Sequence, residues 1–304
     1  MSNLTYIVMP GTRHIPSKTA STAEVQVEEF PDGETSIKLP LNAVTDIKDK
    51  DIVLVGSCHS ALASESFLAT AYEIASLGPK SYTVFNTYFR HARSERVVDH
   101  KAALAKFQAR QWSGLSRVYP GVRLVFAELH KDTITNYFEG PVHTENRCFL
   151  DDLLHECRSP RKENTKLYKP VYATVDEGGI FHARRLASDW EAGFASIVKH
   201  RVSGTETHIM KVEGDDVNGR DVLIIDDMIS TGGSMVNAAK AYFERGALSV
   251  RVLATHGVFS GNAVDKMKDA GIKCVYVTNS HPNAVAAAKE NPDFVKMIQV
   301  PFSF

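Results

Sequence analysis

The chain has 304 residues, of which 43% are hydrophobic, so it can form a globular protein with a sizeable core and has room for two domains. Its 35 Lys and Arg residues nearly balance 36 Asp and Glu residues, which excludes a general electrostatic attraction to nucleic acid or membranes. The four cysteines lack metal-ligand spacing, the apolar runs are too short to cross a bilayer, and the N-terminus lacks a signal-peptide pattern. We therefore expect a cytoplasmic protein with reduced thiols that binds neither nucleic acid nor membrane and that holds anions only locally.

Short apolar runs alternate with helical patterns along the chain. Strands are expected at 4–9, 51–57, 81–86, 122–129, 170–175, 194–200, 221–226, 249–257 and 273–279. Helical patterns such as 61–78 and 101–115 separate them, which is typical of parallel sheets covered by helices on both faces. Nine strands predict two sheets, and the polar stretch 151–170 is expected to be a surface connection. The fold class is therefore α/β, with two doubly wound domains at 1–146 and 147–304.

The segment "DDMISTGGSM" at 226–235 directly follows the apolar, β-branched run 222–225. That run predicts a strand buried on both faces of a parallel sheet, and the helical pattern after the segment stops at Gly246. The segment is thus a strand-to-helix turn at the carboxyl end of a strand, where ligands bind in open α/β sheets.

The residue types in this turn suit two different parts of one ligand. Glycines that can take unusual backbone angles, N–H groups at the helix start and two hydroxyls can cradle a phosphate; these residues are Thr231, Gly232, Gly233 and Ser234. Asp226 and Asp227 cannot hold phosphate, so they must face vicinal sugar hydroxyls or a Mg²⁺ ion. A ribose phosphate supplies both partners at the right separation.

The segment "DVLIIDDMISTGGS" at 221–234 resembles the PRPP-binding motif shared by phosphoribosyltransferases and ribose-phosphate diphosphokinases, the PRPP synthetases. Five more segments, in family order, narrow the resemblance to the second group. Residues 30–39 are similar to its nucleotide loop, 86–96 to its Tyr-Phe…Ala-Arg segment and 128–142 to its divalent-cation signature. Residues 175–179 are similar to its Asp-x-Gly-Gly turn, and 254–263 to the stretch after its PRPP loop. The resemblance implies a phosphoribosyltransferase-like fold with the active site between the two domains.

The reaction that the resemblance implies moves the β,γ-diphosphoryl group of ATP to the C1 hydroxyl of ribose 5-phosphate, giving PRPP and AMP with Mg²⁺ as cofactor. Lys199 and Arg201 resemble the family's catalytic cations, which neutralise the transferred group once a mobile loop closes. His130 and Asp176 resemble metal-linked residues, although Mg²⁺ prefers oxygen ligands. The carboxylates of Asp226 and Asp227 would hold the ribose.

ATP is expected to contact two further segments. Phe30 would stack on adenine, with Asp32 and Glu34 as hydrogen-bond acceptors, although "FPDGE" taken alone is typical of a hairpin turn. In the family this loop reaches the site of a neighbouring subunit, which implies a homo-oligomer built on dimers, with a hexamer as one arrangement. The triphosphate would contact the second segment, together with His130; its residues are Arg93, Ser94 and Arg96.

The chain departs from the family pattern at several of these positions. Ser94 stands where the family usually has Gln, Glu128 where it has Asp, and Ser230 where diphosphokinases usually have Asp beside the 5-phosphate loop. Two alternatives to PRPP formation therefore remain. One is the same transfer to a larger ribose 5-phosphate ester such as ADP-ribose, and the other is a non-catalytic regulatory subunit.

Overall fold

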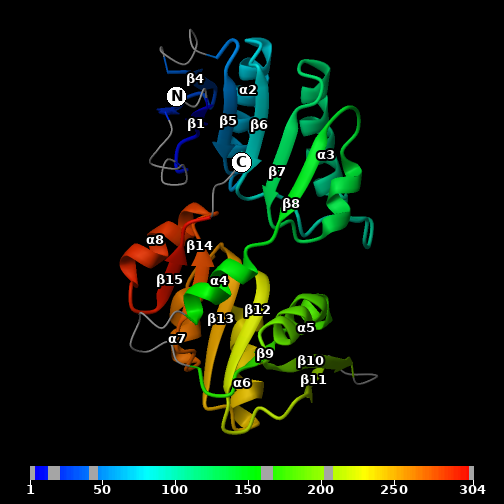
Figure 1. The fold of residues 1–304 in the computed structure, drawn as a ribbon, viewed down its shortest axis with the longest axis vertical. Helices are drawn as coiled ribbons and strands as arrows, with labels where there is room; N and C mark the ends of the chain where they lie inside the picture. The colour runs from blue at the N-terminus through cyan, green and yellow to red at the C-terminus, as the bar shows by residue number, and fades with distance from the viewer. Residues whose placement is uncertain (1–3, 13–20, 41–46, 159–166, 202–207, 301–304) are drawn as a thin grey trace. The chain divides into compact units, whose positions relative to one another are not determined.

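The computed structural model describes residues 4–12, 21–40, 47–158, 167–201 and 208–300, with backbone alone at 199–201 and 208–210. The chain divides into two compact units, and each is described by itself (Figure 1). The first contains the described residues of Met1–Cys148, with Ser280–Pro282 and Val300. The second contains those of Phe149–Asn279 and Asn283–Gln299.

The first unit contains a six-stranded parallel sheet in the order β2-β1-β5-β6-β7-β8. Its strands are β1 (Leu4–Val8), β2 (Ser21–Glu24), β5 (Asp51–Gly56), β6 (Ser81–Asn86), β7 (Arg123–Ala127) and β8 (His143–Arg147). The chain moves from β1 to β2 on one side and later to β5 on the other, as in doubly wound sheets. A separate antiparallel hairpin consists of β3 (Gln26–Glu29) and β4 (Thr35–Lys38).

The described helices of the first unit pack on one face of this sheet. They are α2 (Ala61–Ser76) and α3 (Leu104–Ser113), with the 3₁₀ helices η1 (Gly114–Arg117) and η2 (Asp132–Tyr137). Helix α2 begins at Ser60, whose Oγ accepts a hydrogen bond from the N–H of Ala63 at 3.1 Å. The rings of Phe67 in α2 and Trp112 in α3 pack edge to face, with 4.9 Å between their centroids, in the core that both helices share. The expected cover on both faces is therefore not formed by these two helices.

The second unit contains a seven-stranded sheet in the order β11-β10-β9-β12-β13-β14-β15, in which β11 alone runs antiparallel to its neighbour. Its strands are β9 (Val171–Ala173), β10 (Gly193–Arg201), β11 (His208–Gly214), β12 (Asp221–Ile229), β13 (Ser249–Gly257), β14 (Val275–Thr278) and β15 (Val295–Ile298).

Helices cover both faces of this second sheet, as the sequence predicts. One core cluster includes α4 (Leu150–Cys157) and α5 (Ile180–Asp189), and the other includes α6 (Gly233–Glu244), α7 (Ala263–Asp269) and α8 (Pro282–Glu290). Successive residues of a strand join opposite clusters: Leu223 packs with α4 and α5, and Ile224 packs with α6 to α8. Both are completely buried, so the near-continuous apolar run of β12 follows from burial on both faces.

The order of the second sheet reverses beside β9. The chain moves from β9 to β10 on one side, and β12 lies against β9 on the other side. In open α/β sheets, the crevice at the carboxyl ends of two such strands is where ligands bind. The turns that follow β9 and β12 are therefore where a ligand is expected to bind.

All nine predicted strands form, and the fold class is confirmed. Six further strands were not predicted: β2, β8, β11 and β15 are the edges of the two sheets, and β3 and β4 make the separate hairpin. These strands are partly polar, so they lack the apolar runs on which the prediction rests.

The prediction of a surface connection at 151–170 was wrong for the first part of this stretch. Residues 150–157 form α4, whose Leu153, Leu154 and Cys157 are buried against β13 and β14. Apolar residues at helical spacing outweigh the charged residues between them. Residues 159–166 lie outside the described part of the chain.

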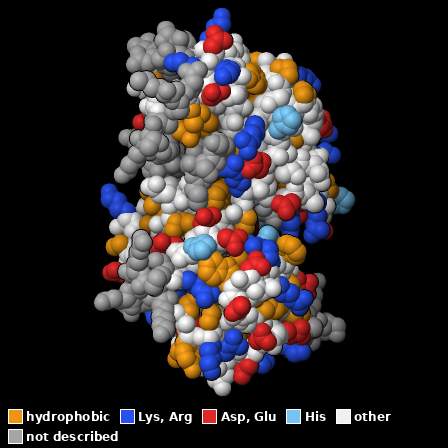
Figure 2. Space-filling view, in the orientation of Figure 1, with side chains coloured by type: hydrophobic (Ala, Val, Ile, Leu, Met, Phe, Trp, Pro, Cys, Tyr) orange, Lys and Arg blue, Asp and Glu red, His pale blue; other side chains and the backbone are white. Residues whose placement is uncertain are grey.

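Charged side chains of both signs are interspersed on the face drawn in Figure 2, in keeping with the near-zero net charge. Among the described residues, no helix is both long and apolar enough to span a membrane.

Candidate functional site

The acidic pair of the "DDMISTGGSM" segment lies on β12, which continues to Ile229 rather than ending at residue 226. Asp226 and Asp227 are both partly buried, and the N–H of Asp227 donates to Asp226 Oδ1 at 2.9 Å. Because β12 is fixed between β9 and β13, the position of this carboxylate pair is set by the sheet.

The turn after β12 has the backbone that a phosphate loop needs. Gly232 has φ +76°, a left-handed conformation that favours glycine, and a Cβ there would lie 3.2 Å from the carbonyl oxygen of Ala263. The N–H of Val236 donates to Gly232 O at 3.0 Å, so α6 begins immediately after this glycine. The first N–H groups of α6 have no acceptor within the helix, and the exposed side chains of Thr231 and Ser234 lie at the same end.

A second segment, 258–263, forms hydrogen bonds with the residues at the start of this turn. The N–H groups of Val258 and Phe259 both donate to Ile229 O at 3.0 Å, and the N–H of Ser260 donates to Ser230 O at 3.0 Å. The hydroxyl oxygens of Ser230 and Ser260 lie 3.4 Å apart. This stretch is part of the segment 254–263 that resembles the family, but the sequence pattern predicts no role for any of its residues.

The turn after β9 meets the same site. Asp176 follows β9 and caps η3 (Glu177–Gly179), because its Oδ1 accepts from the N–H of Gly178 at 2.9 Å. A Cβ on Gly179 would lie 3.5 Å from Ile225 O, which shows that this turn lies close to β12. The predicted residues of the two turns thus share the switch point of one sheet.

Neighbouring carboxyl groups affect the pKa of Asp226. Burial raises the pKa of Asp226 well above its usual range, and the carboxylates of Asp227 and Asp176 raise it further. A neutral hydroxyl or a cation beside Asp226 would offset that cost, whereas an anion would increase it.

In the first unit, His130 follows β7 in a turn with unusual backbone geometry. Glu128 has φ +38° and is buried; its N–H donates to Arg147 O at 2.8 Å, and Cys148 Sγ lies 3.4 Å from Glu128 Oε1. The N–H of Leu129 donates to Asn146 Oδ1 at 2.8 Å. The structure therefore fixes the backbone that presents the half-buried His130.

The predicted triphosphate segment lies in the same unit, between β6 and α3. Arg93 and Arg96 are exposed, and Arg96 Nε lies 3.7 Å from Glu95 Oε1. The carbonyl of Glu95 accepts a 2.6 Å hydrogen bond from the hydroxyl of Tyr137, the last residue of η2. This bond links the segment to the turn that carries His130. The third predicted residue, Ser94, is half-buried, and its carbonyl accepts from the N–H of Ala105 at 3.2 Å.

The predicted nucleotide loop is the tip of the β3–β4 hairpin, in agreement with the turn pattern of its sequence. The N–H of Phe30 donates to Glu34 O, and the N–H of Gly33 donates to Phe30 O, both at 2.8 Å. The N–H of Glu34 donates to Asp32 Oδ1 at 3.2 Å. The Phe30 side chain is 50% exposed, which is unusual for so large an apolar group and leaves its ring open to a ligand or partner.

The structure does not test two of the predicted groups, the catalytic cations and the metal-linked pair. Lys199 and Arg201 lie on β10, but their side chains are outside the described part of the chain. His130 belongs to the first unit and Asp176 to the second, so a metal shared between them remains a prediction. Within the described residues, no three His, Cys, Asp or Glu side chains form a group that could hold a metal by themselves.

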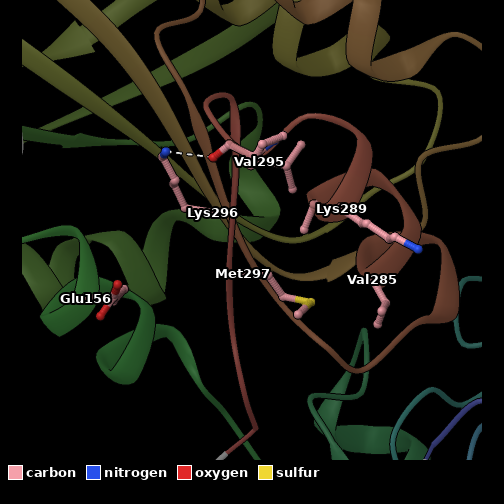
Figure 3. A pocket seen from close by; sticks show the side chains of 8 residues that line it. Glu156, Val285, Lys289, Val295, Lys296 and Met297 are labelled. Carbon is pink, nitrogen blue, oxygen red and sulfur yellow. Dashed lines mark hydrogen bonds between the residues drawn. The ribbon is translucent and has the colours of Figure 1, made fainter. Parts of the chain in front are cut away.

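Two cavities lie apart from these residues. One of about 520 Å³ opens beside β15 and α8 in the second unit; Figure 3 shows Lys296 on the opposite side of β15 from Met297 and Val285. Lys296 Nζ there donates to Pro292 O at 2.7 Å. The other, of about 440 Å³, lies between α2 and α3 in the first unit and includes Arg90. No predicted site residue lines either one.

Comparison with known proteins gives the family. Residues 197–302 match the family described as phosphoribosyl synthetase-associated domain. A ribose-phosphate pyrophosphokinase of Chromobacterium violaceum is 32% identical over 277 residues, which are 90% of this chain and 80% of the relative. One from Vibrio parahaemolyticus is 33% identical over 267 residues, 86% of this chain and 79% of the relative. The chain belongs to the ribose-phosphate pyrophosphokinase family.

The family resemblance stated from the motifs is thus confirmed, and the protein is an enzyme of the transferase class. The crystal structure of phosphoribosylpyrophosphate synthetase from Mycobacterium smegmatis shares its fold, with a TM-score of 0.77 at 22% identity, covering 98% of this chain and 94% of that one.

Proposed function

We propose that the enzyme transfers the β,γ-diphosphoryl group of ATP to the C1 hydroxyl of ribose 5-phosphate, giving PRPP and AMP. The observation that carries this proposal is the switch point of the second sheet, where a partly buried acidic pair is followed by a left-handed glycine at the start of a helix. A sugar phosphate suits both features at once, because its hydroxyls suit the carboxylates and its phosphate suits the loop.

Asp226 and Asp227 hold the 2- and 3-hydroxyls of the ribose in this proposal. The raised pKa of Asp226 means that its carboxylate lacks solvation, so accepting hydrogen bonds from two sugar hydroxyls replaces the missing water. The strand fixes both carboxylates before the sugar arrives, which orients the C1 hydroxyl for in-line attack.

The 5-phosphate occupies the turn after β12, at the N-terminus of α6. Its oxygens accept from the N–H groups of the turn and from the hydroxyls of Thr231 and Ser234. Gly232 is needed there because its left-handed backbone lets the N–H groups converge. Gly233 follows it as the first residue of the helix, where the lack of a side chain leaves room for the phosphate.

Mg²⁺ fits the donor set through carboxylate oxygens rather than through a closed protein cage. Such ions are usually held by one or two carboxylates together with substrate phosphates and water. Asp176 is the exposed carboxylate at the site, and His130 is proposed to hold the ion or one of its waters from the first unit. When bound, the ion would neutralise the triphosphate during transfer.

Lys199 and Arg201 are proposed to stabilise the charge that develops on the transferred group, because cations placed for the transition state lower the barrier directly. ATP is proposed to contact Arg93, Ser94, Arg96 and His130 in the first unit. The exposed Phe30, with Asp32 and Glu34, is proposed to complete the adenine site of a neighbouring copy in a dimer-based homo-oligomer. Sedimentation of a fully active monomer would contradict that assembly.

The test is an assay of AMP release with ATP, Mg²⁺ and ribose 5-phosphate, with PRPP measured in parallel. We expect equal amounts of AMP and PRPP, and a large loss in an Asp227→Asn variant. Release of no AMP with any ribose 5-phosphate compound would overturn the proposal and favour the non-catalytic regulatory alternative, which membership in a family of enzymes speaks against.

A second acceptor, a larger ribose 5-phosphate ester such as ADP-ribose, is favoured by one observation. Ser230, at the start of the phosphate turn, is uncharged and has another hydroxyl as its neighbour. A carboxylate at that position would disfavour a diester whose far end must leave the pocket. Ser230→Asp should keep activity with ribose 5-phosphate and reduce it with the larger ester; an unchanged ratio of AMP released with the two acceptors would remove this candidate.

A further inference from the structure

Ser260 lies on the segment after β13, and backbone hydrogen bonds hold this segment against the end of β12 and the start of the phosphate turn. Its N–H donates to Ser230 O at 3.0 Å, and the preceding N–H groups of Val258 and Phe259 bind Ile229 O. From the other side, Asn283 Nδ2 donates to Val258 O at 2.7 Å. None of these bonds uses the hydroxyl of Ser260, so the segment keeps its position whatever that hydroxyl does.

The two hydroxyls at this point are spaced for a shared third atom. Ser230 Oγ and Ser260 Oγ lie 3.4 Å apart, whereas hydroxyl-to-oxygen hydrogen bonds usually span about 2.5–3.0 Å. Their mutual bond is therefore weak. Two donors at that spacing can both reach one anionic oxygen at about 2.7 Å from each.

The place of the pair identifies that oxygen. Ser230 is the first residue after β12 and directly precedes Thr231 of the phosphate turn, and the acidic pair proposed to face the sugar lies on β12 itself. Gly232, which shapes the turn, packs against Ala263 at the other end of the same supporting segment. Both ends of segment 258–263 thus support the phosphate turn.

We propose that Ser260 is a ligand-binding residue that, together with Ser230, donates a hydrogen bond to one oxygen of the 5-phosphate group of the acceptor. This inference rests on the proposed function for the identity of the acceptor. It adds a contact from a segment that follows a different strand from the one carrying the rest of the phosphate site.

The matched variants are Ser260→Ala, which keeps the backbone N–H but loses the hydroxyl, and Ser260→Thr, which keeps both. Loss of one hydrogen bond to a charged group should raise the KM for ribose 5-phosphate about tenfold in Ser260→Ala. The phosphate is remote from the reacting atoms, so kcat and the KM for ATP should change less than about twofold. Ser260→Thr should stay within about threefold of the wild type. The control is Ser188→Ala, an exposed serine on α5.

Binding of inorganic phosphate, followed by calorimetry on the full chain, separates this inference from the proposed function. Ser260→Ala should bind phosphate about tenfold more weakly and bind unphosphorylated ribose as the wild type does. If ribose and phosphate weaken together, or if neither changes, the hydroxyl does not contact the phosphate and the inference is overturned. A wild type that binds phosphate through Ser260 but releases no AMP would overturn the proposed function alone.

Discussion

The two regions proposed to hold the substrates are built in opposite ways. In the second unit, the proposed phosphate turn follows β12, whose apolar residues 222–225 are buried, and segment 258–263 donates three backbone hydrogen bonds to Ile229 and Ser230. In the first unit, Phe30 is 50% exposed at the tip of a two-stranded hairpin, and the Arg96 side chain is 77% exposed. One region is fixed by the sheet, whereas the other presents its side chains to solvent.

This difference indicates where each substrate's binding energy would originate. The sugar-phosphate region is preorganised, so little conformational entropy is lost when the acceptor binds. The exposed aromatic and arginine side chains must lose rotamer freedom on binding, and they need a partner surface to shield them. The contrast agrees with the proposal that the hairpin completes the site of a neighbouring copy. It also predicts that changes in the second unit affect acceptor binding and turnover, whereas changes in the first affect ATP binding.

The largest expected effect belongs to Lys199, on β10 of the second unit. Lys199→Ala should lower turnover about a hundredfold or more, the scale seen when one preorganised charge-stabilising group is lost, and Arg201→Ala should act in the same direction. A suitable control is Lys211→Ala on the adjacent strand β11, where Lys211 pairs with Glu213 at 3.0 Å. Near-normal turnover in both the Lys199→Ala and Arg201→Ala variants would refute the diphosphokinase mechanism.

The next effect compares one substitution in the two regions. Gly232 and Gly33 both have positive φ, at +76° and +88°, so alanine costs about 1–2 kcal/mol at each. At Gly232 the new Cβ also meets the Ala263 oxygen at 3.2 Å, whereas at Gly33 nothing lies within 4 Å. Thermal unfolding should therefore show the larger loss for Gly232→Ala.

Steady-state kinetics should show that the two variants affect the KM values of different substrates. Gly232→Ala should raise the KM for ribose 5-phosphate, and Gly33→Ala should raise the KM for ATP. If both variants were equally stable and both altered the same KM, the contrast between a supported turn and an open hairpin tip would be wrong.

A smaller effect is expected at the exposed ring of Phe30. Stacking of a base on an aromatic ring contributes about 1–3 kcal/mol, so Phe30→Ala should raise the KM for ATP about tenfold and leave the unfolding temperature unchanged. Phe181→Ala on α5 is the control, because that ring is also exposed, at 74%, but lies in the second unit. An unchanged KM for ATP in Phe30→Ala would indicate that the hairpin has no part in nucleotide binding.

The sequence predicted best those features that depend on burial and on local turn chemistry. The apolar run at 222–225 gave β12, and the paired glycines gave the left-handed turn at Gly232, because both follow from short-range rules. The hairpin at Phe30 was recognisable for the same reason. The edge strands were missed because their residues are partly polar and are held by pairing with a distant strand.

Long-range relations were beyond the sequence pattern. Nothing in the spacing shows that Ser260 bonds to Ser230 thirty residues away, or that Tyr137 binds the carbonyl of Glu95. Likewise, the acidic pair was visible, but the raised pKa of Asp226 depends on Asp176 after another strand. Family resemblance, rather than periodicity, supplied the roles of Lys199 and His130.

The smallest expected effect is on stability, and it tests whether the preorganised region is strained. Because burial and two neighbouring carboxylates raise the pKa of Asp226, the folded state keeps its proton to a higher pH than the unfolded chain does. The folded state thus binds more protons between the unfolded pKa, about 4, and the raised folded pKa, and its stability falls as pH rises through that window. Above the folded pKa, the full cost of a buried carboxylate remains.

Asp226→Asn removes the group that titrates, so its unfolding temperature should exceed that of the wild type by a few degrees at pH 8. The difference should shrink as pH is lowered toward 4, where the wild-type carboxyl is protonated as well. Asp265→Asn, at an exposed position of α7, should show no such pH-dependent gain. Thermal unfolding from pH 4 to 8 without substrates measures both variants. If Asp226→Asn were less stable than the wild type at every pH, the Asp226 carboxylate would stabilise the fold. The proposal that the second unit loses stability in order to bind a ligand with this acidic pair would then be wrong.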